Sequence, residues 1–281
     1  MTLNLTALTG LIDRCLTEDI GGGDITTLAV VEPGTRAAGR MVLREAGVVA
    51  GLPVAALVFA RLSPDVVFRA LVRDGERCPA ATAVAEVSGP AWAVLGGERL
   101  ALNFLQRLSG IATATARLVD KVAGTRARIV DTRKTTPGLR VLEKYAVRCG
   151  GGFNHRFGLY DGVLIKDNHL ALAGGIDRAV RAARERAPHT VRVEVEVEDL
   201  RGVAAALEAG ADIILLDNMD VATMARAVAM VNGRALTEAS GGISGETVAA
   251  VAATGVDFIS VGALTHSVRS LDIGLDFNGG E

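Results

Sequence analysis

The chain has little cysteine, few aromatic residues and no long apolar run. Cys15, Cys78 and Cys149 lie far apart and form no Cys-x-x-Cys pair, so neither a disulfide framework nor a zinc site is predicted. No run of about 18 uncharged apolar residues occurs, which predicts no membrane-spanning helix. The N-terminal residues lack a basic segment and favour an amphipathic helix over a signal peptide. We therefore expect a cytoplasmic protein with no membrane partner.

A strong charge of either sign is also lacking. The chain has 30 Lys and Arg against 32 Asp and Glu, a formal net charge of -2, so there is no broad electrostatic footprint for nucleic acid. Hydrophobic residues make up 49% of the chain, and many are small side chains that let helices pack closely on a parallel sheet. The 281 residues suffice for one large α/β domain or two smaller ones.

Residues 1–107 predict an α+β domain of their own, because their strands cluster with few helices between them. A helix from about residue 97 to 123 connects this domain to the remainder. The expected helices are 5–18 and 52–62, and the expected strands are 36–44, 66–71 and 82–88.

Residues 108–265 alternate strand and helix, which predicts a parallel sheet with right-handed crossovers. The number of strands favours a (β/α) barrel, complete or missing a strand, over a doubly wound sheet, and no Gly-x-Gly-x-x-Gly opens a helix. Residues 266–281 are expected to return to the N-terminal domain. The expected strands are 127–131, 162–166, 191–197, 213–216, 235–239 and 258–261, and the expected helices are 176–186, 199–208, 221–231 and 244–253.

Basic residues concentrate in one stretch of this second part. Between residues 128 and 166 there are eight Lys and Arg against three acids, a local excess of five positive charges. Arginine offers a planar fork for a carboxylate and lysine a compact point charge, so the stretch predicts a pocket for a small, multiply charged anion such as a planar diacid. Surface cations with routine salt bridges are the alternative. The eight are Arg128, Arg133, Lys134, Arg140, Lys144, Arg148, Arg156 and Lys166.

Polar groups end each of the six expected strands, at the edge where barrel enzymes place their chemistry. Glu196 and Asp217 end neighbouring strands; such carboxylates stabilise a developing cation, bind sugar hydroxyls or hold Mg²⁺ through water. Glu194 shares the parity of Glu196, so spacing alone does not choose between them. The alternative is that these acids only balance the basic cluster. His169 is as suited to orienting a loop as to catalysis.

Two small-residue loops follow the last two strands. Ser240-Gly241-Gly242 and Ser260-Val-Gly262-Ala263 resemble a phosphate cradle, because glycines let backbone N–H groups approach an anion and a helix N-terminus adds a favourable dipole. Phosphate sites of barrels commonly lie after the last two strands. His266 is interpreted as structural.

The assembled motifs closely resemble those of the quinolinate phosphoribosyltransferase family, nearly end to end. The resemblance implies a type II phosphoribosyltransferase: an N-terminal α/β sandwich domain plus an open (β/α) barrel with a mostly parallel sheet, working as a homodimer with shared active sites. The most specific motifs are DTRKTTPG, NHRFGLYDG and LIKDNH, accompanied by EDIGGGDITT, ERLALNFLQRLSGIAT, VEVEVE, EASGGI and SVGALTHS.

The resemblance also implies site residues. Glu196, Asp217, Lys134 and Lys166 would be catalytic, and the two acids would lie near the ribose and Mg²⁺, the latter through water. Arg99 would reach in from the partner subunit. The remaining assignments are Arg133, Lys134, His155, Arg156 and Lys166 for the two carboxylates of quinolinate, and Ser240, Gly241, Gly242, Gly262 and Ala263 for the 5-phosphate of phosphoribosyl pyrophosphate (PRPP).

The implied reaction moves phosphoribose from PRPP to the pyridine nitrogen of quinolinate with loss of CO₂, giving nicotinate mononucleotide and pyrophosphate for NAD biosynthesis. Three alternatives stay open: a related phosphoribosyltransferase acting on another pyridine or base, an aldolase-type barrel using Lys166 as a Schiff-base lysine, and a non-catalytic protein that binds a phosphosugar or carboxylate.

Overall fold

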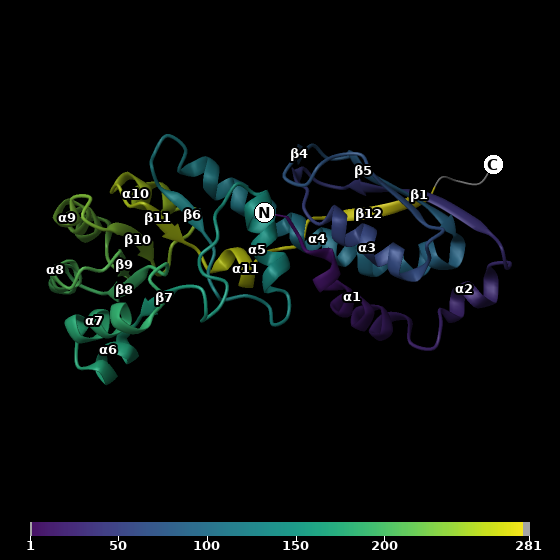
Figure 1. Ribbon diagram of the computed structural model, residues 1–281. Coiled ribbons are helices and arrows are strands. Elements are labelled where there is room, and N and C mark those ends of the chain that lie inside the picture. The colour runs from purple at the N-terminus through teal and green to yellow at the C-terminus, as the bar shows by residue number, and fades with distance from the viewer. Residues whose placement is uncertain (1, 278–281) are drawn as a thin grey trace. The chain divides into compact units, whose positions relative to one another are not determined.

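The computed structural model describes residues 2–277, which form two compact units (Figure 1). The first contains the chain up to Ala116, the segment Leu142–Gly151 and the residues from Ser267 onward. The second contains Arg117–Val141 and Gly152–His266. Helix α4 (Ala91–Lys121) passes from one unit into the other, so residue 107 lies inside a helix. The expected C-terminal segment 266–281 is described only as far as Phe277.

The first unit is built on a four-stranded antiparallel sheet of order β12-β1-β5-β3. The last strand pairs with the first, with Gly39 opposite Phe277 and Leu43 opposite Ile273, so the chain returns to this unit after the barrel. In Figure 1 the yellow β12 lies beside β1. The strands are β1 (Arg36–Leu43), β3 (Val67–Ala70), β5 (Ala83–Pro90) and β12 (Ile273–Phe277), with β2 (Gly47–Val48) and β4 (Arg77–Cys78) forming a separate pair.

Helix α1 (Leu5–Ile20) packs on α3 (Leu52–Leu62) through a regular apolar stripe. Leu8, Ile12 and Leu16 recur every fourth residue and are buried, as expected for one face of a helix. The Asn4 side chain accepts a hydrogen bond from the Ala7 backbone N–H and so caps the helix. A short helix, α2 (Ile25–Val30), follows behind an Asp24 cap.

The second unit is a six-stranded parallel sheet of order β6-β11-β10-β9-β8-β7. Strands β7 to β11 lie side by side in chain order, and β6, the first strand of the unit, lies beside β11, the last. This is the strand order of a barrel and not of a doubly wound sheet. No pairing joins β6 to β7 within residues 2–277, so the barrel is open, as the family resemblance implied, whereas the strand count alone had allowed a complete barrel as well. The strands are β6 (Arg128–Val130), β7 (Val163–Ile165), β8 (Val193–Val197), β9 (Ile213–Asp217), β10 (Leu236–Ser240) and β11 (Phe258–Ser260).

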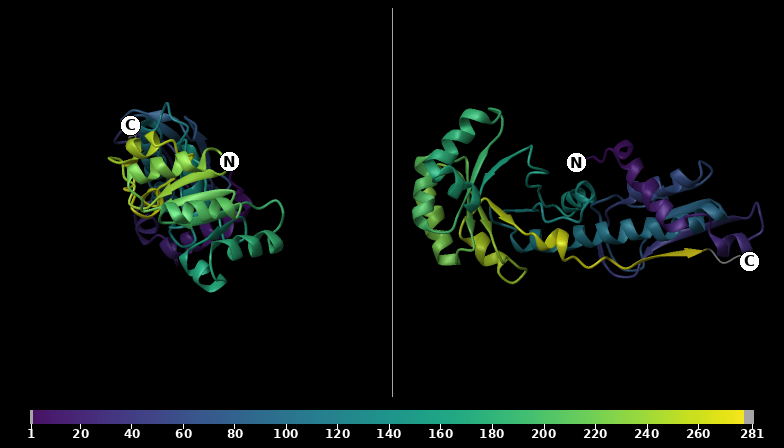
Figure 2. Two further views of the ribbon diagram at one scale, coloured as in Figure 1. Left: turned by 90° about the vertical axis from the view of Figure 1, so that its left-hand side faces the viewer. Right: turned by 90° about the horizontal axis from the view of Figure 1, so that it is seen from below.

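Helices cover the outer face of this sheet, as the right-hand view of Figure 2 shows for the green part of the chain. On β8, Val193, Val195 and Val197 are buried while Glu194 and Glu196 alternate with them. Because successive strand residues point to opposite faces, the valines face the helices and the glutamates face the barrel interior. The helices that follow β7 to β11 along the chain are α6 (Asp167–Ala173), α7 (Ile176–Arg186), α8 (Leu200–Glu208), α9 (Val221–Val231), α10 (Val248–Ala253) and α11 (Ala263–His266).

Helix α5 (Arg140–Cys149) is the main element that the sequence interpretation missed. It carries Lys144 and Arg148 into the first unit, so these two cations belong to that unit and not to the barrel. Lys144 is fully buried. Among the contacts of the helix, the buried carboxylate of Glu143 accepts from Arg107, and the Tyr145 hydroxyl lies 2.7 Å from an Asp74 oxygen. The cations at positions 140, 144 and 148 therefore recur every fourth residue because they lie on a helix.

No helix within residues 2–277 combines the length and apolar character needed to cross a membrane. The longest, α4, contains buried polar residues such as Ser109 and Thr113, which bond to the backbone of Ala50 and Val48. It also approaches the C-terminal segment closely at Gly110, where an added Cβ would lie 2.3 Å from the carbonyl oxygen of Arg269.

Gly110→Ala is expected to destabilise the first unit, because the new methyl group meets backbone that has no rotamer to change. Overpacking of this kind costs about 1–3 kcal/mol, more than the helix propensity gained from alanine. Gly10→Ala in α1 is the matched control, since its Cβ would meet only the end of the Arg14 side chain at 3.6 Å. Urea and thermal unfolding should show a lower midpoint for the first variant and an equal or higher one for the second; equal midpoints for both would contradict the close approach.

Candidate active site

The carboxyl ends of the barrel strands surround a cavity of about 820 Å³. Every residue that lines it belongs to the second unit. All the site residues expected from sequence line it except Arg99, which is exposed on α4 in the first unit. The lining residues are Thr132, Arg133, Lys134, His155, Arg156, Leu164, Lys166, Glu196, Leu215, Asp217, Asn218, Glu238, Ser240, Gly241, Gly242, Ile243, Ser260, Val261, Gly262, Ala263 and His266.

Four of the eight cations in the basic stretch reach this cavity: Arg133, Lys134, Arg156 and Lys166. Burial lowers the pKa of Arg156, and the nearby positive charge of Arg133 lowers it further. The Arg156 guanidinium also donates to the Gly162 carbonyl at 3.0 Å. Like charges therefore crowd here without fully compensating partners, which is the condition for binding an anion.

Asp131 holds the segment that brings His155 and Arg156 to the cavity. Its carboxylate is fully buried at the end of β6 and accepts hydrogen bonds from the Asn154 side chain at 2.5 Å and the His155 backbone N–H at 2.9 Å. Phe153 forms a parallel bridge to Val130, next to β6. This segment is thus attached to the open edge of the sheet by backbone and carboxylate together.

Lys166 and Glu196 form an ion pair inside the cavity. The lysine lies just before α6, and the backbone N–H of Lys166 donates to Nδ1 of His169 at 2.9 Å. His169 is exposed and does not line the cavity, so it orients the loop and does not touch a ligand there. Glu196 is mostly buried and Lys166 is about half exposed, with side-chain exposures of 15% and 44%.

Asp217 lies at the end of β9, beside Ser240 at the end of β10. Its carboxylate accepts from the Asn218 side chain at 2.7 Å, and the Asn218 backbone N–H donates to the Ser240 carbonyl at 3.0 Å. Asn218 has a φ of 52°, a left-handed conformation that asparagine tolerates better than most residues. Asn218 therefore orients the Asp217 carboxylate, and Asp217 still lines the cavity.

The loop after β10 requires glycine. Gly241 and Gly242 have φ values of 93° and 60°, and an added Cβ on Gly241 would lie 2.1 Å from the Asn218 side-chain oxygen. At Gly262 a Cβ would come within 3.0 Å of the Lys134 side chain. Both loops thus expose backbone to the cavity, as a phosphate cradle needs. The helix that follows Gly262 spans only Ala263–His266. The exposed backbone of the glycines would therefore contribute more to binding an anion than the dipole of this short helix.

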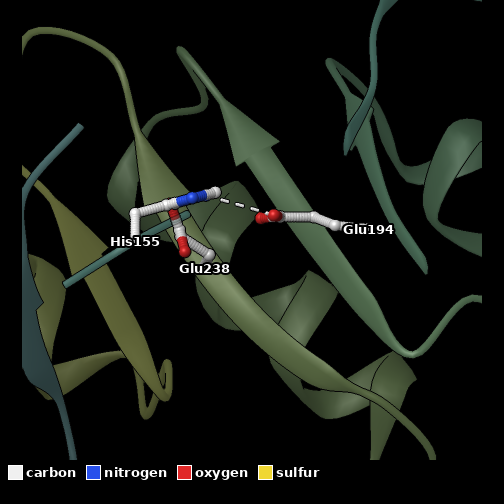
Figure 3. A group of neighbouring side chains, drawn as sticks. All are labelled: His155, Glu194 and Glu238. Atoms are coloured by element: carbon white, nitrogen blue, oxygen red, sulfur yellow. Dashed lines mark ion pairs between the residues drawn. The ribbon is translucent and has the colours of Figure 1, made fainter. Parts of the chain in front are cut away.

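A buried group of three titratable side chains lies at the floor of the cavity (Figure 3). His155 Nε2 is 3.1 Å from a Glu194 oxygen and 3.7 Å from a Glu238 oxygen. Both glutamate side chains are only 5% exposed. Burial, together with the neighbouring charge of Glu194, raises the pKa of Glu238 to about 8. Glu194 thus serves the floor of the site, while Glu196 faces Lys166 and the cavity.

Several lining residues were not selected from the sequence. Glu238 could have been found by parity, because it precedes Ser240 by two positions on the same strand and so faces the same interior. His266 lines the cavity instead of being purely structural, and it lies four positions after Gly262, one turn along α11. Thr132 and Asn218 flank residues that the motifs had marked, and Ser260 belongs to the second small-residue loop already interpreted as part of a phosphate cradle.

Comparison with known proteins gives consistent family matches along the chain. The family models for the N-terminal and C-terminal domains of quinolinate phosphoribosyl transferase match residues 24–109 and 111–276. A protein of Bacillus subtilis (strain 168) named probable nicotinate-nucleotide pyrophosphorylase [carboxylating] is 45% identical over 274 residues, covering 98% of this chain and 94% of the relative. The corresponding enzyme of Mycobacterium leprae (strain TN) is 50% identical, covering 94% and 95%.

The fold agrees with these sequence matches. The crystal structure of NadC from Streptococcus pyogenes superposes with a TM-score of 0.94 at 41% identity and covers 99% of this chain and 100% of that one. The nicotinate-nucleotide pyrophosphorylase of Pyrococcus furiosus, only 18% identical, shares the fold with a TM-score of 0.71. The chain belongs to the quinolinate phosphoribosyltransferase family.

Proposed function

We propose that the protein transfers phosphoribose from PRPP to the pyridine nitrogen of quinolinate and releases CO₂ and pyrophosphate, forming nicotinate mononucleotide. One observation carries the proposal: a single cavity joins a cationic side, the acid pair Glu196 and Asp217, and two glycine loops. These three parts match a dicarboxylate, a ribose and a phosphate. The names of the most similar relatives support the same reaction.

The cationic side suits a pyridine that carries two carboxylates. Arg133 and Arg156 offer planar forks, and Lys134 and Lys166 offer point charges. Nicotinate, with a single carboxylate, would leave most of these cations without an anionic partner in a partly desolvated pocket, which is costly. The cavity therefore favours quinolinate over a mono-acid base.

Glu196 and Asp217 would serve the ribose. As pyrophosphate leaves, the ribose carbon gains oxocarbenium character, and carboxylates fixed nearby stabilise that charge more than they stabilise the ground state. Both acids present oxygen ligands to one cavity, and oxygen donors are what Mg²⁺ prefers, commonly through water and together with substrate phosphates. When bound, the metal would neutralise part of the diphosphate charge.

Decarboxylation needs little further machinery. Bond formation at the pyridine nitrogen makes the ring cationic, and the electron pair left at C2 by loss of CO₂ is stabilised next to that cation as an ylide. C2 then takes up a proton from solvent, which gives nicotinate mononucleotide. The contribution of the protein is then to hold the ring in place and exclude alternative orientations. The cations that bind the remaining carboxylate supply this positioning.

The contact between Lys166 and Glu196 bears on the aldolase alternative. Schiff-base chemistry requires an amine that is free to attack a carbonyl, whereas the Lys166 amine is held in an ion pair with Glu196. The glycine loops would also have no role in an aldolase without a phosphorylated substrate. A non-catalytic binding protein is disfavoured for a different reason, since two acids beside the phosphate loops would repel a phosphosugar unless they served a developing cation or a metal.

We further propose a homodimer in which Arg99 of the partner subunit completes the quinolinate site. Arg99 is exposed and does not line the cavity of its own chain. A shared site would explain why a cation at that position belongs to the family pattern.

The direct test is turnover of quinolinate with PRPP and Mg²⁺, followed by release of pyrophosphate and CO₂. We expect activity with quinolinate, loss of activity on chelation of the metal, and recovery on adding Mg²⁺. Nicotinate under the same conditions is the control and should react at least about a hundredfold less efficiently, since losing an anchored carboxylate removes several kcal/mol of binding. Equal turnover of both bases would point to a related transferase instead.

Lys166→Ala and Glu196→Gln are expected to act in opposite directions on quinolinate binding. The first removes a cation and should weaken binding about tenfold or more. The second frees Lys166 from its ion pair and should leave quinolinate affinity unchanged or a few-fold higher while turnover with PRPP falls. Calorimetric titration of quinolinate alone, beside steady-state kinetics, separates the two effects. Parallel weakening by both variants would mean that the ion pair persists in the complex.

Mixed dimers test the shared site. Arg99→Ala chains and Lys134→Ala chains are expected to be inactive alone and to recover up to about a quarter of wild-type activity when combined, because random assortment places one intact site in half of the dimers. Mass spectrometry should confirm that heterodimers have formed. Formed heterodimers without recovered activity would show that each site is built from one chain.

A further inference from the structure

Two buried acids at the floor of the cavity have no role in the proposed reaction. Glu194 is on β8 and Glu238 is on β10, with β9 between them. Interior side chains from alternate strands of a barrel lie in common layers, which explains how the two come together. One oxygen of each, Oε1 in both cases, is buried and lacks a hydrogen-bond partner among the described residues. Figure 3 shows both side chains pointing toward the His155 ring.

The hydrogen bonds of His155 fix the position of its ring proton. Nδ1 accepts the backbone N–H of Arg156 at 2.7 Å, and a ring nitrogen that accepts a hydrogen bond carries no proton. The proton must therefore lie on Nε2, where the nearest acceptor is Glu194 at 3.1 Å. The geometry thus assigns a neutral imidazole that donates to Glu194 and accepts from the backbone of the next residue.

A metal ion is the obvious alternative for this group, because the three ligand atoms lie within 4.8 Å of one another. One histidine and two glutamates are an acceptable donor set for zinc. Coordination through Nε2, however, needs a lone pair on the nitrogen that carries the proton. The Arg156 N–H blocks the other tautomer. The three side chains are therefore better suited to a proton on His155 Nε2 than to a bound metal ion.

Two ionised carboxylates this close and this buried would repel each other strongly. Burial and the charge of Glu194 both favour the protonated form of Glu238. The other groups near Glu238 are Asp131 at the end of β6, which opposes its ionisation, and the Ser260 hydroxyl on β11, which favours it. His155 would favour ionisation only as a charged imidazolium, and the neutral ring assigned above does not carry that charge. Burial and the neighbouring carboxylate together therefore favour a proton on Glu238.

We propose that Glu194 and Glu238 are positioning residues that hold His155 in its Nε2–H tautomer, with Glu194 accepting the Nε2 proton and Glu238 lying beside the same nitrogen. Through the bond from the Arg156 backbone to His155 Nδ1, they also hold Arg156 in the cavity. This inference rests on the proposed function, since the side chains they position are those assigned to the quinolinate carboxylates. The acids act through His155 and do not bond to the substrate.

The tautomer can be tested without any substrate. Nitrogen-15 chemical shifts of the His155 ring, assigned by comparison with His155→Gln, should show protonated Nε2 and unprotonated Nδ1 at neutral pH. A protonated Nδ1 would overturn the proposal. So would a stoichiometric divalent metal in the purified protein that disappears in Glu238→Gln. Neither result would contradict the proposed reaction, because turnover of quinolinate tests that reaction separately.

Kinetics of four variants test the positioning role. Glu194→Gln and Glu238→Ala should raise the quinolinate KM about tenfold, the effect of losing one partner in a buried hydrogen-bonded group, with a smaller change in the KM for PRPP. Glu238→Gln imitates the protonated acid and should restore most of the quinolinate affinity lost in Glu238→Ala. Glu198→Gln, an exposed glutamate just after β8, is the matched control. Equal damage from Glu238→Ala and Glu238→Gln would show that the ionised carboxylate is required.

The same variants predict a pH dependence. As pH rises, Glu238 loses its proton, the two carboxylates repel, and the quinolinate KM should rise on the alkaline side. Because glutamine cannot ionise, Glu238→Gln should lack this alkaline rise, whereas Glu198→Gln should retain it. An alkaline rise that persists unchanged in Glu238→Gln would assign the rise to another group and contradict a protonated Glu238 at neutral pH.

Discussion

The structure of the cavity depends on how the repulsion among its basic side chains is offset. Arg133, Lys134, Arg156 and Lys166 line one space, and at separations of a few ångströms like charges at a partly buried site cost several kcal/mol. The only cavity acid in ion-pair contact with one of these cations within residues 2–277 is Glu196, with Lys166. The excess positive charge therefore remains available to a ligand, and a dianion would relieve a repulsion that the protein already bears.

Backbone geometry makes this concentration of charge possible. Parallel strands bring all their carboxyl ends to one edge, so residues separated by more than a hundred positions become neighbours. Alternation along each strand then sorts side chains between helix-facing and interior positions: on β10, Thr237 and Ala239 face outward while Glu238 and Ser240 face the interior. The same rule explains why Glu194 and Glu196 share the interior but differ in depth, one buried under His155 and the other beside Lys166.

The sequence was sufficient to predict every barrel strand and the helices α7 and α9, because their apolar periodicity is strong and each strand ends in polar residues. It was insufficient for α5, where the cations suggested a pocket although Arg140, Lys144 and Arg148 recur at helical spacing. Burial of a whole lysine such as Lys144 depends on contacts with distant segments that no local pattern encodes. Glu238 was passed over for a similar reason, since its importance comes from Glu194 and His155, which only folding brings near it.

The proton on Glu238 has a consequence for the charge of the whole site. If Glu238 were ionised, its negative charge would offset part of the positive charge of the cavity. The effect would be large, because screening is weak in a poorly solvated interior. A neutral Glu238 keeps the floor polar and hydrogen-bonding without that loss. An apolar residue at this position would offer no polar partner to His155, and an ionised carboxylate would reduce the positive charge of the cavity. A protonated Glu238 is a polar partner for His155 and leaves the cavity positive toward a dicarboxylate.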